Sequence, residues 1–212
     1  KQTYPYTYKN TLPIWSDINL PQLTRYIETS CSLSYVRSAT PGIPLDLGNC
    51  QPFGAQNFLF VHNGYIDNFR QSLYRPIRNN LSDYGYQLIT GNTDSEHIFA
   101  LVADNLNQLD KSEDLAQVLK KALDELNKIA TTHQVYFSAN TILSDGKQLV
   151  ASRYANRSPV PSLYWLRDDP LFPQSVIIAS EPLFEGDWHI FPEQSIIRVT
   201  ESLEVNFLPL NS

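Results

Sequence analysis

Three short groups of polar residues combine side chains that together could hold an amino acid and activate its side-chain carbonyl. Arg37 ends an alternating segment, Asn63-Gly64 follows the apolar run 58–61, and Asp94 stands at the start of an amphipathic segment. A guanidinium offers a planar pair of donors to a carboxylate, and an aspartate is a counter-ion for an ammonium. An amide side chain and a glycine N–H that converge on one point would stabilise an oxyanion. An α-amino acid with an electrophilic side-chain carbonyl, such as glutamine or a γ-glutamyl group, suits all three.

Each group also has an ordinary structural explanation. Asn-Gly is a strong hairpin signal because both residues tolerate positive φ, so we expect the strand that begins at Phe58 to end in a turn at Asn63-Gly64. Arg37 could be a surface or ion-paired residue. Asp94 in the first turn of a helix would be stabilised by the helix dipole. At this point both explanations stay open for each group.

Two amphipathic helices are expected in the middle of the chain. Thr93 and Glu96 have the spacing of a capping box, and the helix that follows should bury one face, made of Ile98, Phe99, Leu101, Val102 and Leu106. A second helix is predicted over about 112–129, where the apolar periodicity is the clearest in the chain. Shorter helices are predicted over 18–27 and 66–74.

Alternating or apolar segments elsewhere predict strands. They are an edge strand within 1–12, a strand over 32–39, the strand beginning at Phe58, and strands over 135–141, 147–154, 162–167, 175–180, 195–200 and 203–208. Asp145-Gly146 is typical of a hairpin turn between two of them. Strands on both sides of a central helix pair predict an α+β fold in which helices pack on antiparallel sheets, not a βαβ series. The length of 212 residues suits one domain, 1–212.

Composition argues against several classes of protein. The net charge of −6 and the pI near 5.1 disfavour a nucleic-acid partner or an anionic membrane surface. No apolar run approaches the roughly 18 residues of a membrane span, and no signal-peptide pattern opens the sequence. Two cysteines do not make a disulfide scaffold, so a cytoplasmic location is expected. The four histidines lack ligand-like spacing, so we expect neither a metal nor another cofactor.

The order and spacing of five segments resemble the class II glutamine amidotransferases. These segments are Tyr35–Gly42, Pro52-Phe53, His62–Gly64, Thr93–Glu96 and Ser180–Leu183. The resemblance covers nearly the whole chain from about Pro13. Within the family, the stretches 13–17 and 36–42 most resemble the stand-alone hydrolases of the EgtC type. Those enzymes remove the γ-glutamyl group from γ-glutamyl-hercynylcysteine sulfoxide in ergothioneine biosynthesis.

The resemblance implies a fold and a set of site residues. The family are N-terminal-nucleophile hydrolases, built as a four-layer αββα sandwich. The Asn63 side chain and the Gly64 N–H would form the oxyanion hole, and Asp94 would bind the α-ammonium group of the substrate.

The resemblance also places a carboxylate-binding subsite around Arg37. Arg37 would bind the α-carboxylate of the substrate, with Thr40 in the same subsite. Ser38 stands where many members of the family carry a bulky aromatic residue. This difference suits a more open site that accepts a substrate larger than glutamine.

The nucleophile of the family is an N-terminal cysteine whose own α-amino group is the general base. This sequence starts at Lys1 and contains no Met, so we expect that an N-terminal piece with the nucleophile, first strand included, precedes it in the natural protein. Neither Cys31 nor Cys50 has a free α-amine. A conventional thiol dyad of Cys50 with His62 is a second interpretation.

Three functions are consistent with these residues. The first is hydrolysis of a γ-glutamyl amide through a cysteine thioester, acting on a γ-glutamyl conjugate as in ergothioneine biosynthesis. The second is a glutaminase subunit that delivers ammonia to a synthase partner. The third is a non-catalytic, amidotransferase-like binding module. Each binds a small γ-glutamyl compound or glutamine, and both a homo-oligomer and a synthase complex stay open.

Overall fold

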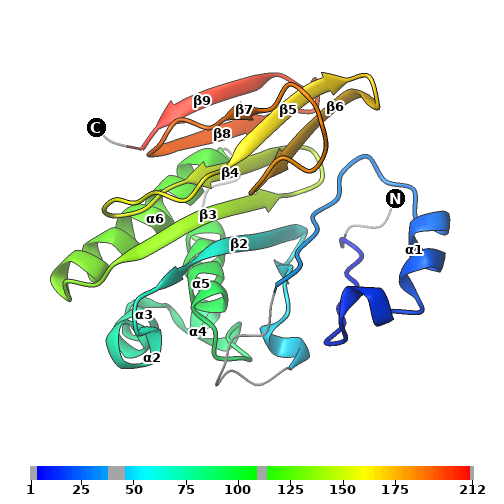
Figure 1. The fold of residues 1–212 in the computed structure, drawn as a ribbon. Coiled ribbons are helices and arrows are strands. Elements are labelled where there is room, and N and C mark those ends of the chain that lie inside the picture. Colours follow the sequence, from blue (N-terminus) through cyan, green and yellow to red (C-terminus); the bar gives the residue numbers. More distant parts are fainter. Residues whose placement is uncertain (1–3, 38–45, 109–113, 211–212) are drawn as a thin grey trace.

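The computed structural model describes residues 4–37, 46–108 and 114–210, which form two antiparallel sheets and a group of helices (Figure 1). A six-stranded sheet has the order β1-β2-β3-β4-β8-β9. Its strands are β1 (Phe53–Ala55), β2 (Phe58–Ile66), β3 (Phe137–Ser144), β4 (Leu149–Arg153), β8 (Ser195–Val199) and β9 (Val205–Pro209). A three-stranded sheet has the order β6-β5-β7 and contains β5 (Tyr164–Asp169), β6 (Phe172–Ala179) and β7 (His189–Ile190).

Two long helices and several short ones complete the described elements. The long ones are α5 (Asp94–Asn107) and α6 (Leu115–Thr132). The short ones are α1 (Leu20–Tyr26), α2 (Phe69–Ser72), α3 (Tyr74–Asn80), α4 (Asp83–Gln87) and the 3-10 turns η1 (Ile14–Ser16) and η2 (Leu47–Asn49). None of these helices combines the length and the apolar character that crossing a membrane requires.

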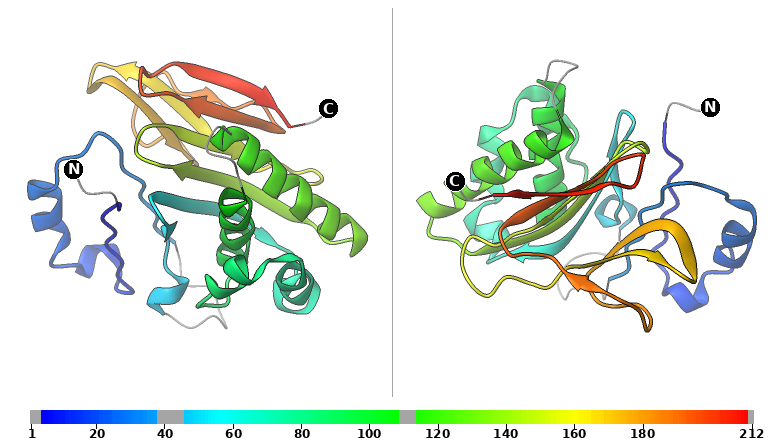
Figure 2. Two further views of the ribbon diagram at one scale, coloured as in Figure 1. Left: turned by 180° about the vertical axis from the view of Figure 1, so that it is seen from behind. Right: turned by 90° about the horizontal axis from the view of Figure 1, so that it is seen from above.

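The layers follow the αββα order. Helix α5 contacts β1 and β2, and α6 contacts β3, β4 and β8, so the pair covers one face of the six-stranded sheet. The three-stranded sheet packs on the other face through a cluster that includes Ala151, Leu163, Phe191 and Ile197. Helix α1 lies on the side of the molecule away from α5 and α6 (Figure 2). The α+β sandwich expected from the sequence is therefore confirmed, with two stacked antiparallel sheets and the pair α5 and α6 on one of their outer faces.

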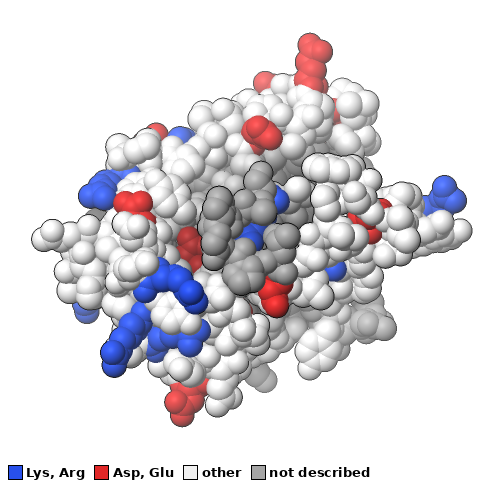
Figure 3. Space-filling model, turned by 60° about the horizontal axis from the view of Figure 1, so that its bottom comes forward, with Lys and Arg blue, Asp and Glu red and all other residues white. Residues whose placement is uncertain are grey.

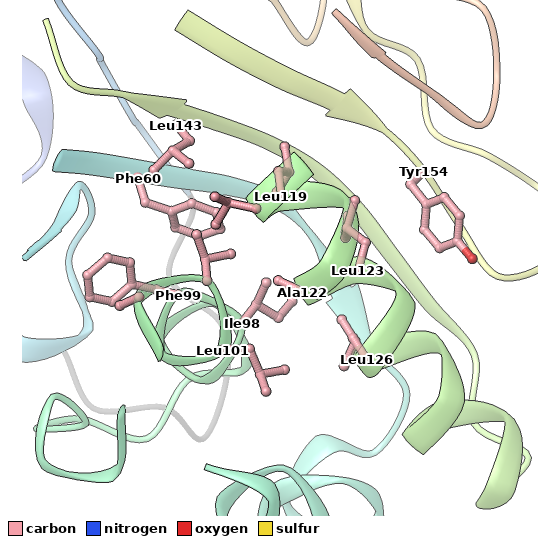
Figure 4. Packing of buried hydrophobic residues seen from close by; sticks show 14 of the residues in the cluster. Phe60, Ile98, Phe99, Leu101, Leu119, Ala122, Leu123, Leu126, Leu143 and Tyr154 are labelled. Atoms are coloured by element: carbon pink, nitrogen blue, oxygen red, sulfur yellow. The ribbon is translucent and has the colours of Figure 1, made fainter. Parts of the chain in front are cut away.

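The main core lies between the helix pair and the six-stranded sheet (Figure 4). Phe60 of β2 and Leu143 of β3 point toward Phe99 of α5 and Leu119 of α6. The apolar faces predicted for both helices are buried, apart from Leu106 and Ile129, which are half-buried.

The predicted cap of α5 forms in a modified way. Thr93 Oγ1 accepts from the Glu96 N–H at 3.2 Å, as a capping box requires. The Glu96 carboxylate does not return to Thr93. It accepts from the backbone N–H groups of Thr90 and Gly91, each at 2.8 Å, and so fixes the turn that leads into the helix.

The Asn63-Gly64 turn predicted from the sequence is wrong. Both residues lie inside β2, opposite Asn140 and Ala139 of β3. The ladder continues to Ile66 because β3 pairs with β2 over eight consecutive positions. The turn propensity of two residues is overridden by this continuous pairing. The hairpin predicted at Asp145-Gly146 is confirmed, with Gly146 at φ +82° between β3 and β4.

Other predicted elements differ in detail. The described residues of 1–12 and 32–39 contain no strand. Exposure still alternates over 32–37, but alternation reports only which way side chains face, and a strand also needs a neighbour that pairs with it. The helix predicted over 66–74 is replaced by α2 and α3, which meet at Leu73. The six strands predicted after His133 are confirmed, whereas β7, with two residues, carries no sequence pattern.

Candidate active site

Residues Asn63 and Gly64 lie where one edge of β2 has no strand beside it. Strand β1 pairs only with positions 58–60 of β2. Two residues further on, the Gln51 side chain takes the place of a strand. Its Oε1 accepts from the His62 N–H at 2.6 Å, and its Nε2 donates to the His62 carbonyl at 3.0 Å.

The same edge ends at the carboxylate of Asp94. Asp94 Oδ2 accepts from the Ile66 N–H at 3.0 Å. Backbone groups along a strand alternate between its two edges, so Gly64, midway between His62 and Ile66, directs its N–H to this edge as well. The Gly64 N–H is therefore presented between the Gln51 amide and the Asp94 carboxylate.

The Asn63 side chain is exposed. Its neighbours Phe60 and Ile66 belong to the core beneath α5 and α6. Because side chains of a strand alternate between faces, Asn63 points to the opposite face, where the three-stranded sheet lies. The Asn63 amide on the face of β2 and the Gly64 N–H on its edge come from adjacent residues of one rigid strand, so a single oxygen atom seated at the border between face and edge is within reach of both donors.

Asp94 is held firmly at the first turn of α5. Oδ1 accepts from the Ser95 N–H at 2.8 Å while Oδ2 binds the Ile66 N–H. The carboxylate is half-buried and lies at the positive end of the helix dipole. Its orientation is therefore fixed, and each oxygen keeps a further lone pair for a ligand.

Tyr35 connects the segment that carries Arg37 to Asp94. Burial raises the pKa of the Tyr35 hydroxyl; the Arg37 charge lowers it, and the Asp94 charge raises it further. The charges of Arg37 and Asp94 thus act on the same hydroxyl with opposite sign. Arg37 itself is half-buried, and no described carboxylate forms an ion pair with it. Ser38 and Thr40 lie outside the described residues.

The sequence did not point to Gln51, and it assigned no role to Tyr35 or Ser95, although both lie in segments that carry the family resemblance. The position of Tyr35 could have suggested that it lies near the site. It stands two residues before Arg37, and residues two apart in an extended segment face the same way. Gln51 carried no such signal, because its role is to replace a strand neighbour, which only the sheet reveals.

The alternative thiol dyad of Cys50 and His62 is wrong. The His62 ring nitrogens contact Ser95 Oγ at 2.9 Å and the Ser138 carbonyl at 3.0 Å. Cys50 Sγ instead contacts backbone carbonyls, with Asp46 O at 3.4 Å. Both cysteines are free thiols. In the three described ranges, no group of three or more His, Cys, Asp and Glu side chains could hold a metal ion.

Two surface grooves lie away from these residues. One, of about 340 Å³, is lined by Tyr74, Arg75, Arg78, Asn79 and Tyr86. Lys and Arg side chains gather over α2 and α3 on the face shown in Figure 3. The other groove, of about 480 Å³, lies between α3 and α6. Neither is lined by Arg37, Asn63 or Asp94, so the candidate site is an open strand edge and not one of these grooves.

A family model and two relatives of known name relate this chain to the same family of proteins. A model of the class II glutamine amidotransferases matches residues 17–183. The probable glutamine amidotransferase DUG3 of Saccharomyces cerevisiae is 29% identical over 92% of this chain, which spans 64% of the length of that relative. The γ-glutamyl-hercynylcysteine sulfoxide hydrolase of Mycolicibacterium smegmatis is 24% identical over 92% of this chain and 71% of its own length.

A solved structure agrees over almost the whole chain. The glutamine aminotransferase class-II domain protein from Silicibacter pomeroyi superimposes with a TM-score of 0.80 and 26% identity. The match covers 98% of this chain and 86% of that protein.

We predict that Gly64→Ala destabilises the protein by about 1–3 kcal/mol or more. A Cβ at this position would lie 2.1 Å from the Ser138 carbonyl oxygen and 2.6 Å from His62 Nε2, and the backbone atom cannot rotate away. Urea unfolding measures the change. Gly54→Ala is the control, because its Cβ would meet the flexible Leu59 side chain at 3.2 Å and the Phe58 carbonyl oxygen at 3.3 Å, both more than 1 Å further away than the Ser138 oxygen is from a Cβ on Gly64. Equal losses for the two variants would contradict this account of Gly64.

We also predict that stability falls on acidification because of His97. Burial is the main cause that lowers the pKa of His97 to about 4. Its Nδ1 donates to the Thr93 carbonyl, and Nε2 accepts from Arg78 Nε. Between pH 6.5 and about 4 the unfolded chain takes up a proton that the folded chain does not, so the free energy of unfolding falls by as much as about 3 kcal/mol.

Urea unfolding of the wild type and of His97→Gln, from pH 7.5 to pH 4.5, checks this prediction. The variant should be less stable at pH 7.5 and should lose less stability on acidification. Parallel pH dependences of the two proteins would refute the assignment to His97.

Proposed function

Because the chain belongs to the class II glutamine amidotransferases, we propose that it hydrolyses the amide bond of a γ-glutamyl compound. The observation that carries this proposal is the free stretch of the β2 edge, where the Gly64 N–H stands two residues from the Asp94 anchor at Ile66. A donor for an oxyanion, on β2, and a counter-ion for an ammonium, on α5, thus meet at one edge of the strand.

The spacing along this edge suits a glutamyl group. Two residues of a strand span about 6.5 Å. The γ-carbonyl carbon and the α-nitrogen of an extended glutamyl group are about 5 Å apart by standard bond lengths. A γ-carbonyl placed at Gly64 therefore brings the α-ammonium to Asp94. Arg37, whose charge acts on the Tyr35 hydroxyl as the charge of Asp94 does, would receive the α-carboxylate.

The proposed reaction uses these groups in two steps. The thiol of a cysteine at the mature N-terminus gives its proton to its own α-amine, and the thiolate so formed attacks the γ-carbonyl carbon. The carbonyl electrons move to oxygen, and the oxyanion is stabilised by the Asn63 amide and the Gly64 N–H. The intermediate collapses to a glutamyl thioester and expels the amine, which takes the proton from the α-amine. Water then attacks the thioester, releasing glutamate and restoring the thiol.

We propose further that the physiological substrate is a γ-glutamyl conjugate with a leaving amine larger than ammonia. The relative from Mycolicibacterium smegmatis is named as a hydrolase of such a conjugate, which supports this substrate class and an ergothioneine-type compound within it. The yeast relative is named as a probable glutamine amidotransferase, which favours glutamine and an ammonia-accepting synthase as the second candidate.

Reaction rates with a γ-glutamyl conjugate and with glutamine, measured on the full-length natural protein, separate these two candidates. A protein that binds glutamate but hydrolyses neither would be a binding module.

We predict that Asn63→Ala lowers the turnover number by about 10²–10³-fold and leaves binding nearly unchanged, because the amide acts only on the charge that develops in the transition state. Steady-state kinetics of the full-length natural protein measure the effect. Asn79→Ala is the control, because Asn79 is an exposed asparagine on α3. An Asn63→Ala enzyme with the wild-type turnover number would exclude the oxyanion role.

We predict that Asp94→Asn weakens the affinity for glutamate about 10–100-fold, since a hydrogen bond to a charged group contributes about 1.5–3 kcal/mol. Isothermal titration calorimetry measures this affinity without any reaction. Asp83→Asn is the matched control, because Asp83 is also the first residue of a helix but is exposed on α4. Similar losses in both variants would point to a helix-dipole effect and not to a bound ammonium.

A further inference from the structure

His62 is a fully buried polar residue directly behind the candidate site. Its side chain has 0% exposure, although it belongs to the strand that carries Asn63 and Gly64. The ring contacts α5 through Ser95 and β3 through Ser138. Such a residue must have all its hydrogen bonds satisfied, because an unpaired polar group is costly in the core.

The partners of the ring fix its tautomer. The Ser138 carbonyl can only accept, so Nε2, at 3.0 Å, carries the proton. Burial lowers the pKa of His62, so the ring is neutral at physiological pH. Nδ1 then has a lone pair and accepts from the Ser95 hydroxyl at 2.9 Å.

This tautomer has a consequence for Asp94. Ser95 has a single hydroxyl proton, which it donates to His62. The Ser95 Oγ also lies 3.4 Å from Asp94 Oδ1, but it has no second proton to offer there. Asp94 is therefore held by backbone N–H groups alone at Ser95 and Ile66. The Ser95 hydroxyl therefore leaves the Asp94 carboxylate free to accept a hydrogen bond from a ligand.

The ring also supports Gly64. A Cβ on Gly64 would lie 2.6 Å from His62 Nε2, so the glycine backbone rests directly against the imidazole. On the other side, the two hydrogen bonds from Gln51 hold the His62 backbone. His62 is thus fixed at its backbone and ring, and it touches the elements that present Gly64 and Asp94.

We propose that His62 is a positioning residue of the γ-glutamyl site, which sets the Gly64 N–H and the Asp94 carboxylate at a fixed separation. The inference rests on the proposed function and adds a role to a residue that does not touch the substrate. The ring joins β2, β3 and the N-terminus of α5 at one point. Loss of either ring contact lets the oxyanion donor and the ammonium counter-ion move relative to each other.

Three variants of the full-length natural protein test this role. His62→Gln keeps one donor and one acceptor but replaces the rigid ring, which holds Ser95 and Ser138 at fixed positions, with a flexible side chain. Ser95→Ala removes only the hydroxyl, and it serves if the His62 variant does not fold. His97→Gln is the control, because His97 is also fully buried on α5, yet its ring leads to Arg78 and away from Gly64.

The expected results are a fall in kcat/KM of at least 10-fold and a weaker affinity for glutamate in His62→Gln and Ser95→Ala, with neither change in His97→Gln. The glutamate affinity is then measured again with Asp94→Asn present. If His62 acts through Asp94, adding Ser95→Ala to Asp94→Asn weakens binding by less than 2-fold. A merely structural role would give the full single-variant effect in both backgrounds.

The outcomes separate the two proposals. A wild type that neither binds glutamate nor hydrolyses any γ-glutamyl compound overturns the proposed function and, with it, the role of His62. An active wild type whose folded His62→Gln and Ser95→Ala variants keep the wild-type kcat, KM and glutamate affinity overturns the role of His62 alone. Full additivity with Asp94→Asn does the same.

Discussion

The pairing of β2 with β3 is the constraint on which the rest of the site depends. Eight consecutive positions of β2 are held by β3, from Leu59 to Ile66. One edge of β2 is therefore rigid, while β1 covers only the first three positions of the other edge. On that second edge, the backbone N–H and C=O groups beyond position 60 are held in place by the β2–β3 pairing. They make no hydrogen bonds to a neighbouring strand.

An open edge is normally a liability, because unpaired N–H and C=O groups attract other strands. Here the edge is divided among side chains. Gln51 satisfies both backbone groups of His62, and Asp94 accepts from Ile66. The interval between them is one residue wide and holds the backbone N–H and C=O of Gly64. Because side chains bind the backbone on both sides of Gly64, the backbone groups of Gly64 stay available to a ligand. A neighbouring strand would have used those groups in its own hydrogen bonds.

Much of the fold could be predicted from the sequence, because helix periodicity and strand alternation report burial directly. The faces of α5 and α6 and the six strands of the C-terminal half follow from such patterns. Asn63-Gly64 shows the limit. Its local signal is that of a turn, but Gly64 is needed for a different reason, the close approach of Ser138 and His62. A contact between residues 74 positions apart leaves no trace in a window of neighbouring residues.

The site was less accessible to pattern reasoning than the fold. Arg37, Asn63 and Asp94 stood out as residue types, but only the resemblance to a family assigned them to one ligand. The residues that hold them, Gln51 and Ser95, have ordinary positions in the sequence and acquire a role only through the tertiary fold.

The N-terminus of α5 joins the core to the candidate site. Within one helical turn, Asp94 holds the edge of β2, Ser95 holds the His62 ring and Glu96 holds the preceding turn. His97 completes the turn by binding Arg78 of α3. Four successive side chains thus tie three segments, β2, the preceding turn and α3, to one helix end. Both histidines in this network are buried and have lowered pKa values, so protonation of either ring would disturb the core. The hydrogen bonds from Asp94 and Ser95 to β2 also keep a counter-ion and an oxyanion donor at a constant distance, so at these two residues stability and function depend on the same hydrogen bonds.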